Sequence, residues 1–347
     1  MNRLKSSVII LGIESSCDDT SAAIIKDTTI LSNVTASQEI HRQFGGVVPE
    51  LASRAHQQNI VPVVDAALKK ANVTLKDVDG IAFTKGPGLL GSLVVGTSFA
   101  KSIALALDKP LIDVNHMHGH VLAHFIDQDG KSKPKFPFLC LTISGGHTQI
   151  VLVKDHLEME VIGSTIDDAA GEAFDKTAKI LGLPYPGGPL IDRYAQLGDP
   201  LKYSFSKPQM EGYNYSFSGL KTSILYFLQK EIKKNPQFIE EELNHICASV
   251  QHSIIEILFQ KLIKASKELN IRQIAIAGGV SANSGVRSRL LQLQDEKRWE
   301  VFIPDFQYCT DNAGMIAVTG FFMHQKGLFT DQTVAAMARL PFNKLSV

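Results

Sequence analysis

The chain alternates short apolar runs with longer amphipathic stretches. Eight runs rich in β-branched residues are bounded by glycine or polar turns, and each predicts a strand: 8–13, 21–25, 80–84, 111–114, 138–143, 149–153, 273–277 and 300–303. Apolar residues at helical spacing predict helices over 48–71, 92–107, 169–181, 241–269 and 311–325. This alternation of strands and helices is typical of layered α/β proteins.

A polar stretch over 125–138 divides the chain into two halves. It contains Asp-Gln-Asp-Gly and Lys-Ser-Lys-Pro-Lys, which are sequences typical of linkers. A chain of 347 residues is also longer than one hydrophobic core usually supports. We therefore expect an N-terminal domain over 1–130, a second domain over 131–310, and a C-terminal helical segment over 311–347 that packs back on the first.

Each half opens with the same pattern of a strand, a polar turn and a second strand, over 10–25 and over 138–153. Two such turns facing a shared cleft would match the actin-, hexokinase- and Hsp70-like (ASKHA) nucleotide-binding folds, in which two turns grip phosphates from opposite sides. The sequence pattern alone leaves open a second interpretation, two unrelated hairpins.

Charge and cysteine content narrow the class of protein. The 35 basic and 35 acidic side chains cancel, so nucleic acid would have to be bound through a local patch or a partner protein. The four cysteines form no Cys-x-x-Cys pair, which argues against a zinc ribbon and a disulfide scaffold. Nowhere do about eighteen apolar residues run together. We expect a cytoplasmic protein that does not engage the membrane.

Four histidines lie between His116 and His124, directly after a predicted strand. His116 and His120 are four residues apart, so on a helix both imidazoles would share one face and could hold one metal ion. A polar, solvated helix start is the alternative. Met117 stands where a His-Glu-x-x-His metalloprotease carries its glutamate, which argues against a peptidase of that class.

Two glycine-containing turns are candidates for nucleotide binding. The turn over 142–148 lies between two strands, and its glycines would let the backbone approach a phosphate. The turn over 277–283 follows a strand and opens a helix, where amide groups are available. Ordinary turns would show the same residues, so neither turn decides the function alone.

Several acidic and aromatic residues have two interpretations. Glu172 and Asp175 lie inside a predicted helix, where a functional role is more plausible than a dipole-complementing one. Asp311 either starts the last long helix or reaches a ligand as a third metal-binding residue. The segment 203–221 interleaves aromatic residues with lysines, as in surfaces that stack bases, but an aromatic loop closing over a cleft fits equally well.

Taken together, these motifs resemble the TsaD family, once called the glycoprotease family. The matching blocks are 12–20, 45–54, 86–89, 116–120, 144–149, 167–179, 185–189, 217–222, 277–283 and 309–312. They occur in order from Leu11 to about Met323, nearly the whole chain.

The resemblance implies a transferase that moves a threonylcarbamoyl group from threonylcarbamoyl-AMP to the N6 amine of the adenosine 3′ to the anticodon in ANN-decoding tRNAs. It places the metal ligands on His116, His120 and Asp311. The implied metal is Fe²⁺ or Zn²⁺, with iron preferred, although these ligand types suit both. It also implies a metal-less TsaB-like paralogous partner and a small TsaE-like ATPase.

The resemblance further places substrate-binding positions in the second half of the chain. These positions are Thr142, Ile143, Ser144, Gly145, Gly146, Asp175, Gly188, Asp192 and Asn283. Glu172 and Asp175 are our candidates for groups that orient or deprotonate the substrate.

Three positions depart from the family pattern. His118 stands where bacterial relatives commonly carry glutamate, and His124 adds another imidazole, so a different ligand set is conceivable. Thr142 stands where archaeal relatives carry a tyrosine that can approach the metal.

A metallopeptidase and a catalytically silent nucleotide-binding scaffold are the rival functions. The first lacks the glutamate described above, and intact His116, His120 and Asp311 argue against the second.

Overall fold

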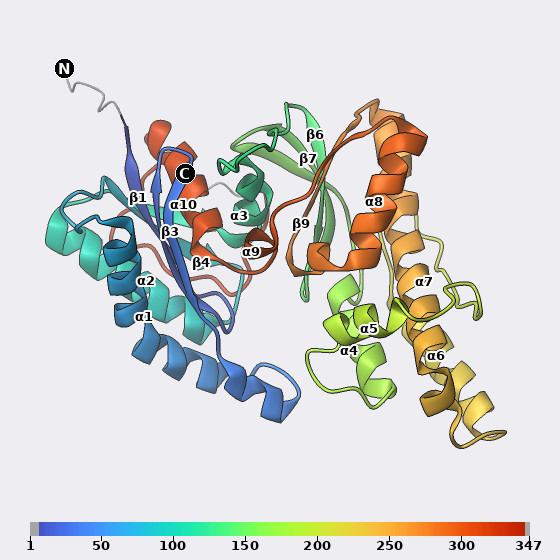
Figure 1. Ribbon diagram of the computed structural model, residues 1–347. Coiled ribbons are helices and arrows are strands. Elements are labelled where there is room, and N and C mark those ends of the chain that lie inside the picture. Colours follow the sequence, from blue (N-terminus) through green and yellow to red (C-terminus); the bar gives the residue numbers. More distant parts are fainter. Residues whose placement is uncertain (1–6, 344–347) are drawn as a thin grey trace. The chain divides into compact units, whose positions relative to one another are not determined.

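The structure is a computed structural model that describes residues 7–343, and the chain divides into two compact units. Among the described residues, unit 1 contains those up to 133, 155–159 and those from 304 onward; unit 2 contains 134–154 and 160–303. Two five-stranded mixed sheets, each with its own helices, make up the chain (Figure 1). The α/β class predicted from the alternating pattern is confirmed.

Unit 1 is built on a sheet with the order β3-β2-β1-β4-β5. Its strands are β1 (Ile9–Glu14), β2 (Thr20–Lys26), β3 (Thr29–Ala36), β4 (Gly80–Gly86) and β5 (Leu111–Asn115). Its helices are η1 (Glu39–Phe44), α1 (Pro49–Ala71), α2 (Leu90–Leu107), α3 (His116–Leu122), η2 (Ala123–Phe125), α9 (Phe306–Cys309) and α10 (Ala313–Gln325). β1 pairs antiparallel with β2 and parallel with β4.

Strand β1 carries different contacts on its two faces, because side chains alternate along a strand. Leu11 and Ile13 are buried in a cluster with apolar residues of α1 and α2. Gly12 points the other way, where a Cβ would lie 2.6 Å from the carbonyl oxygen of Ala313. Helix α10 therefore lies directly on the opposite face of the sheet, and glycine permits this close approach.

Unit 2 is built on a sheet with the order β10-β9-β6-β7-β8. Its strands are β6 (Phe138–Ile143), β7 (Thr148–Asp155), β8 (Glu158–Ser164), β9 (Gln273–Ala277) and β10 (Glu300–Phe302). Its helices are α4 (Ala170–Ile180), α5 (Gly188–Ala195), α6 (Ser218–Ile232), α7 (Phe238–Leu269), η3 (Gly279–Ala282) and α8 (Ser284–Lys297). Leu139, Leu141 and Ile143 of β6 share a core with the long helix α7.

The internal repeat is confirmed as two antiparallel hairpins. In unit 1, β1 and β2 pair from Ile9–Lys26 to Glu14–Ser21. In unit 2, β6 and β7 pair from Phe138–Val153 to Ile143–Thr148. Each hairpin also continues into a parallel neighbour, β4 or β9.

Two expectations about elements were wrong. The segment 311–347 is not one helix: α10 ends at Gln325, and Gly327 turns the chain with φ +67°, a left-handed conformation that glycine adopts easily. Residues 344–347 lie outside the described part. In the segment 203–221, Phe205, Tyr215 and Phe217 are buried in the core of unit 2, so they neither stack bases nor form a free loop.

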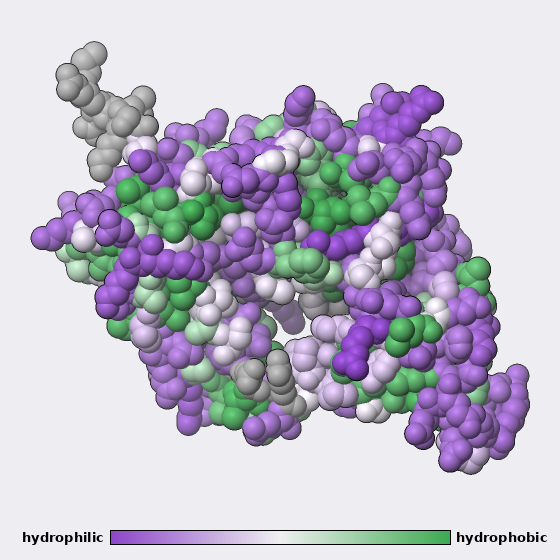
Figure 2. Space-filling model, viewed as in Figure 1, coloured by the Kyte–Doolittle hydropathy of each residue, from purple (hydrophilic) through white to green (hydrophobic). Residues whose placement is uncertain are grey.

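Two helices, α2 and α7, meet the length and hydropathy criteria of a membrane span. Core helices of soluble proteins meet the same criteria, and 78% of the apolar window of α7 is buried within the fold. The face shown in Figure 2 is largely hydrophilic, with hydrophobic residues in separate patches. These two helices are therefore weak evidence for a membrane protein.

Candidate functional site

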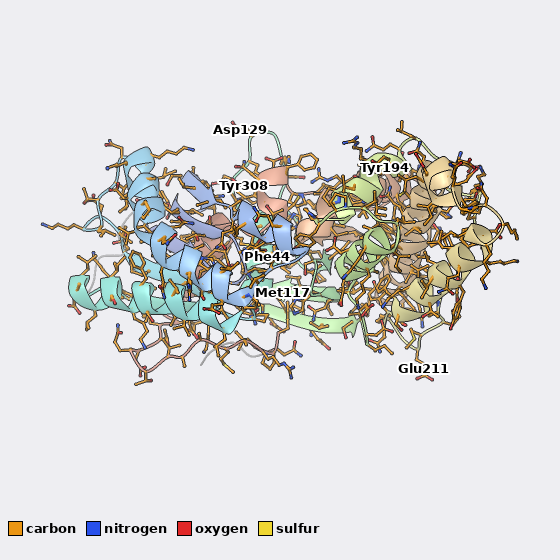
Figure 3. All side chains as sticks on the ribbon, turned by 90° about the horizontal axis from the view of Figure 1, so that it is seen from below. Phe44, Met117, Asp129, Tyr194, Glu211 and Tyr308 are labelled. Carbon is orange, nitrogen blue, oxygen red and sulfur yellow. The ribbon has the colours of Figure 1, made fainter. Side chains whose placement is uncertain are left out.

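Helix α3 begins directly where strand β5 ends, and Asn115 makes that transition. Its side-chain oxygen accepts a hydrogen bond from the backbone N–H of Met117 at 2.9 Å and so caps the helix. Gly119 faces α10, where a Cβ would lie 3.1 Å from the side chains of both Met315 and Ile316. Helix α3 thus packs tightly on the start of α10. Met117 itself is buried and offers no polar group (Figure 3).

This packing brings together the three predicted metal ligands, all in unit 1. Oδ1 of Asp311 lies 3.4 Å from Nε2 of His116 and 3.2 Å from Nε2 of His120. One potential ligand atom from each residue lies within 4.8 Å of the others. The two imidazole rings are perpendicular, with centroids 4.8 Å apart. Nitrogen and carboxylate donors that converge in this way form a suitable site for Fe²⁺ or Zn²⁺.

His120 is the most deeply buried of these three residues. Both of its ring nitrogens are buried, and neither makes a hydrogen bond with any residue in the described part of the chain. Nε2 is close to Asp311, but the geometry is not that of a hydrogen bond. A buried imidazole nitrogen this close to a carboxylate oxygen is placed to share an ion with it.

A buried polar network contacts the Nδ1 nitrogen of His116. Its Nδ1 lies 3.1 Å from Oε2 of Glu14 and 3.2 Å from the hydroxyl of Ser16. Glu14 is completely buried at the end of β1. It also accepts hydrogen bonds from the Thr84 hydroxyl at 2.6 Å and the Ser16 backbone N–H at 2.5 Å. A carboxylate that accepts a hydrogen bond from the non-ligating ring nitrogen of a histidine fixes the tautomer and the ring orientation.

The charges around this cluster favour a cation. Burial alone would lower the pKa of His116, but attraction to Asp311 and Glu14 raises it well above its usual value. Burial would raise the pKa of Glu14 and of Asp311, but the charge of His116 lowers both. A proton on His116 therefore compensates two carboxylates here, and a metal ion would take over that role on binding.

The other two histidines of the stretch stay outside the cluster. Nε2 of His118 donates a hydrogen bond to the carbonyl oxygen of Phe342 at 2.8 Å, and burial lowers the His118 pKa to about 4. This nitrogen carries its proton and cannot ligate a metal. His124 is buried in η2. Among residues 7–343, the group that could hold a metal ion contains His116, His120 and Asp311 and neither of these.

In unit 2, the predicted glycine turn between β6 and β7 is open on one side and packed on the other. Ser144 closes the turn, because its backbone N–H donates to the carbonyl oxygen of His147 at 2.8 Å. Gly145 and Gly146 have no neighbouring atom within 4 Å of a Cβ position. On the packed side, a Cβ at Gly278 would lie 2.5 Å from the Ile143 carbonyl oxygen.

The predicted polar positions of unit 2 mostly fix helix starts. Oδ1 of Asp175 accepts hydrogen bonds from the backbone N–H groups of Gly187 and Gly188, at 2.9 and 3.1 Å, where α5 begins. Burial raises the pKa of Asp175, despite these bonds. Both carboxylate oxygens of Asp192 accept hydrogen bonds from Ser284, from its backbone N–H and its hydroxyl.

Asn283 and Glu172 are likewise engaged. The Asn283 side chain caps α8 through the backbone N–H of Val286 at 3.0 Å, and its amide donates to Gln251 at 2.7 Å. Glu172 forms an ion pair with Lys176 at 2.7 Å, and its side chain is 43% exposed. Thr142 is fully buried, and its hydroxyl donates to the Gln149 carbonyl oxygen at 3.4 Å.

Comparison with known families decides the relationship. The sequence model described as "TsaD: tRNA N6-adenosine threonylcarbamoyltransferase" matches residues 29–318. The chain belongs to this family of transferases. It is 62% identical to the tRNA N6-adenosine threonylcarbamoyltransferase of Christiangramia forsetii, over 96% of this chain and 98% of that protein. It is 60% identical to the one from Riemerella anatipestifer, over 96% and 98%.

Solved structures support the fold. HypF from T. kodakarensis matches 94% of this chain and 49% of its own, with a TM-score of 0.62 and 14% identity. Component A of (R)-2-hydroxyglutaryl-CoA dehydratase from Acidaminococcus fermentans matches 92% and 99%, with a TM-score of 0.51 and 16% identity. At such identities the likeness concerns the fold alone, and it confirms the predicted two-domain ASKHA-like architecture.

The sequence did not reveal the residues that support His116. In the sequence, Glu14 is one of several acids near a turn, and nothing in its spacing connects it to a histidine about a hundred positions later. The signal that could have found it is its place at the end of an apolar, central strand. A carboxylate there is buried, and a buried carboxylate needs a partner.

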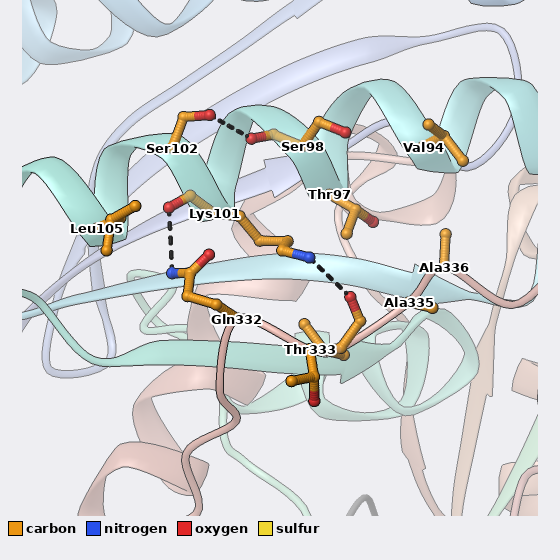
Figure 4. Close-up of a pocket in the computed structure, with 11 residues that line it drawn as sticks. Val94, Thr97, Ser98, Lys101, Ser102, Leu105, Gln332, Thr333, Ala335 and Ala336 are labelled. Atoms are coloured by element: carbon orange, nitrogen blue, oxygen red, sulfur yellow. Dashed lines mark hydrogen bonds between the residues drawn. The ribbon is translucent and has the colours of Figure 1, made fainter.

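Unit 1 also contains a cavity of about 520 Å³ that includes no residue of the metal cluster. It lies between one face of α2 and the segment 332–336, which begins in a turn (Figure 4). Lys101 crosses it and donates to the Val334 carbonyl oxygen at 3.1 Å, while the Gln332 side chain donates to the Lys101 carbonyl oxygen at 3.3 Å. These bonds attach the C-terminal segment to α2.

Proposed function

We propose that this protein transfers a threonylcarbamoyl group from threonylcarbamoyl-AMP to the N6 amine of the adenosine 3′ to the anticodon in ANN-decoding tRNAs. Membership of the family supports the reaction, and the observation that carries its metal dependence is the convergence of His116, His120 and Asp311. In this reaction the amine nitrogen bonds to the carbamoyl carbon. The bond from that carbon to the phosphate oxygen breaks, AMP leaves with the electron pair, and the amine loses one proton.

The three converging residues would hold Fe²⁺ or Zn²⁺, which when bound supplies a Lewis acid for a phosphate or carbonyl oxygen. Glu14 and Ser16 keep the His116 ring in the orientation that directs Nε2 at Asp311. The buried network around Glu14 thus pre-forms the donor set. A pre-formed set reduces the free-energy cost of organising ligands when the ion binds.

Unit 2 is proposed to bind the adenylate. The open side of Gly145 and Gly146 leaves the backbone of the turn accessible to a phosphate, with Thr142, Ile143 and Ser144 as its base. Gly188 begins α5, with its amide held by Asp175. Asp192 and Asn283 are proposed to fix the start of α8 beside the nucleotide.

Asp175 is our candidate to take the proton that the attacking amine loses. Its second carboxylate oxygen is not engaged by the two glycine amides, which both bond Oδ1. Burial raises its pKa, which makes it a stronger base than an ordinary aspartate. Glu172, paired with Lys176, is the alternative candidate.

We also propose that the chain acts in the cytoplasm with a TsaB-like paralogue and a TsaE-like ATPase. Its net charge of zero supports a need for partners, because tRNA affinity depends strongly on local positive charge.

A reconstituted reaction tests this proposal. The purified chain, the two partners and ATP are mixed with threonylcarbamoyl-AMP and an ANN-decoding tRNA transcript. We expect AMP and threonylcarbamoyladenosine in equal amounts, and no modified nucleoside from a transcript with guanosine 3′ to the anticodon. AMP release without tRNA modification would contradict the transferase assignment.

A further inference from the structure

The last described residues of the chain follow unit 1 back to the metal helix α3. This C-terminal strap, Thr330–Phe342, first pairs with β5, where the backbone N–H of Thr330 donates to the Leu111 carbonyl oxygen at 2.9 Å. Lys101 then holds it at Val334 (Figure 4). The Met337 N–H donates to the Lys85 carbonyl oxygen at 2.8 Å. The strap is thus attached at several points before it reaches α3.

The middle of the strap packs against Gly86, where there is no space for a side chain. A Cβ at Gly86 would lie 1.9 Å from the carbonyl oxygen of Met337. Two residues on, the Gly88 N–H donates to the Ala338 carbonyl oxygen at 3.2 Å. The path of the strap is therefore fixed by backbone contacts with the turn after β4.

At its end, the strap contacts Asn115 and His118, which lie close to the proposed ligands His116 and His120 in the sequence. The Asn115 amide donates to the Pro341 carbonyl oxygen at 3.3 Å, while its oxygen caps α3. His118 donates to the Phe342 carbonyl oxygen at 2.8 Å, and its ring lies against the Phe342 ring with centroids 4.6 Å apart. Asn115 and His118 flank His116, and His118 precedes His120 by two residues.

We propose that the C-terminal strap is a positioning element for the metal site, and that Asn115 and His118 are the positioning residues through which it holds α3. The inference rests on the proposed metal role of His116 and His120. Helix α3 has only seven residues, and so short a helix is not stable without tertiary contacts. Helix α3 also packs on α10 through Gly119, so loss of the strap contacts would let α3 shift on α10 and move both imidazoles relative to Asp311, which lies just before α10.

Co²⁺ binding tests the inference, because its visible absorption reports both occupancy and coordination geometry. Replacing His118 by leucine removes the donor to Phe342, whereas His118→Gln keeps an N–H at a similar position. We expect the Co²⁺ Kd of His118→Leu to rise about tenfold with an altered spectrum, in the range found for lost outer-sphere partners, and His118→Gln to restore most of both.

Chain truncation gives a matched pair that leaves α3 itself unchanged. A chain ending at Leu340 lacks the carbonyl groups of Pro341 and Phe342, and a chain ending at Asn343 keeps them. We expect only the shorter chain to bind Co²⁺ about tenfold more weakly. Thermal unfolding without metal shows whether each variant is folded.

The possible outcomes distinguish a failure of this inference from a failure of the proposed metal site. If the unaltered chain binds no Co²⁺, the proposed metal site is wrong and the inference is overturned with it. If the unaltered chain binds Co²⁺ and both His118→Leu and the Leu340-ending chain bind it equally well with the same spectrum, only the inference is overturned. A folded His118→Leu with weaker binding and rescue by His118→Gln would support it.

Discussion

The carboxylate of Glu14 lies 3.1 Å from Nδ1 of His116, while the other ring nitrogen, Nε2, faces Asp311 at 3.4 Å. Glu14 therefore determines which nitrogen of His116 is free to ligate a metal. The carboxylate accepts a hydrogen bond from Nδ1–H, so the neutral form of His116 has its lone pair on Nε2. A metal ion that displaces the second proton from Nε2 can bind this lone pair.

Glu14→Gln should weaken metal binding while leaving the cluster itself intact. The amide removes the negative charge behind His116, and we expect the Zn²⁺ Kd to increase about tenfold, measured by competition with a chromophoric chelator. Glu50→Gln is the control, because Glu50 is an exposed carboxylate on α1 that pairs with Arg54 at 2.6 Å and lies outside the His116, His120 and Asp311 cluster. Equal Zn²⁺ affinity in both variants would show that Glu14 has no supporting role.

Adjacent glycines in unit 2 separate a structural role from a binding role. Gly278 has φ +87° and no space for a Cβ, so Gly278→Ala should reduce the free energy of unfolding by about 2–3 kcal/mol in urea denaturation. Gly279 has no atom within 4 Å of a Cβ position. Gly279→Ala should keep normal stability but bind AMP more weakly, if the adenylate approaches this turn. Unchanged AMP affinity in Gly279→Ala would remove this turn from the proposed nucleotide site.

Asp175→Asn should show whether Asp175 only holds the start of α5 or also accepts a proton during the reaction. The asparagine oxygen can still accept the two glycine N–H groups, so we expect an unchanged melting temperature. The turnover number of the reconstituted transfer should fall about 100-fold, because the amide cannot take a proton. Glu172→Gln is the comparison, and we expect little effect from it. If it were the more damaging change, the two roles would be reversed.

His56 should make unit 1 sensitive to mild acid. It is buried between the Thr20 hydroxyl and the Cys17 carbonyl oxygen, at 2.8 and 2.9 Å, and burial lowers its pKa below the usual 6.5. The stability that neutral His56 contributes is present above pH 6.5 and is lost as the pH falls below that value, because only the unfolded chain then binds the proton readily.

Urea unfolding near pH 7.5 and near pH 5.5 measures this loss. We expect the unaltered chain to lose more free energy of unfolding than His56→Gln, which keeps a donor but does not titrate. Identical losses in the two proteins would mean that His56 titrates normally.

The sequence predicted the elements with strong periodicity and missed those without it. The strands 138–143 and 273–277 have the predicted bounds, because both are mostly apolar and are followed directly by a glycine-containing turn. Strands β3 and β8 were not predicted, since most of their residues are only half-buried and polar residues interrupt the apolar ones.

The site was predictable where its ligands lie at helical spacing, and less so where the fold brings distant segments together. His116 and His120 follow from one helical turn. The approach of Asp311 depends on Gly12 and Gly119, which let α10 pack closely on β1 and α3. The contact of His118 with Phe342 joins residues more than two hundred positions apart, and no local pattern encodes it.

The most direct test of the account is the threonylcarbamoyladenosine content of tRNA from cells in which His120→Ala replaces the unaltered chain. Nucleosides from digested tRNA are quantified by mass spectrometry, with the abundance of both proteins matched by immunoblot. We predict that the unaltered chain restores the modified nucleoside in cells depleted of the native copy and that His120→Ala does not. A full level of threonylcarbamoyladenosine with His120→Ala would contradict a metal-dependent transfer by this protein.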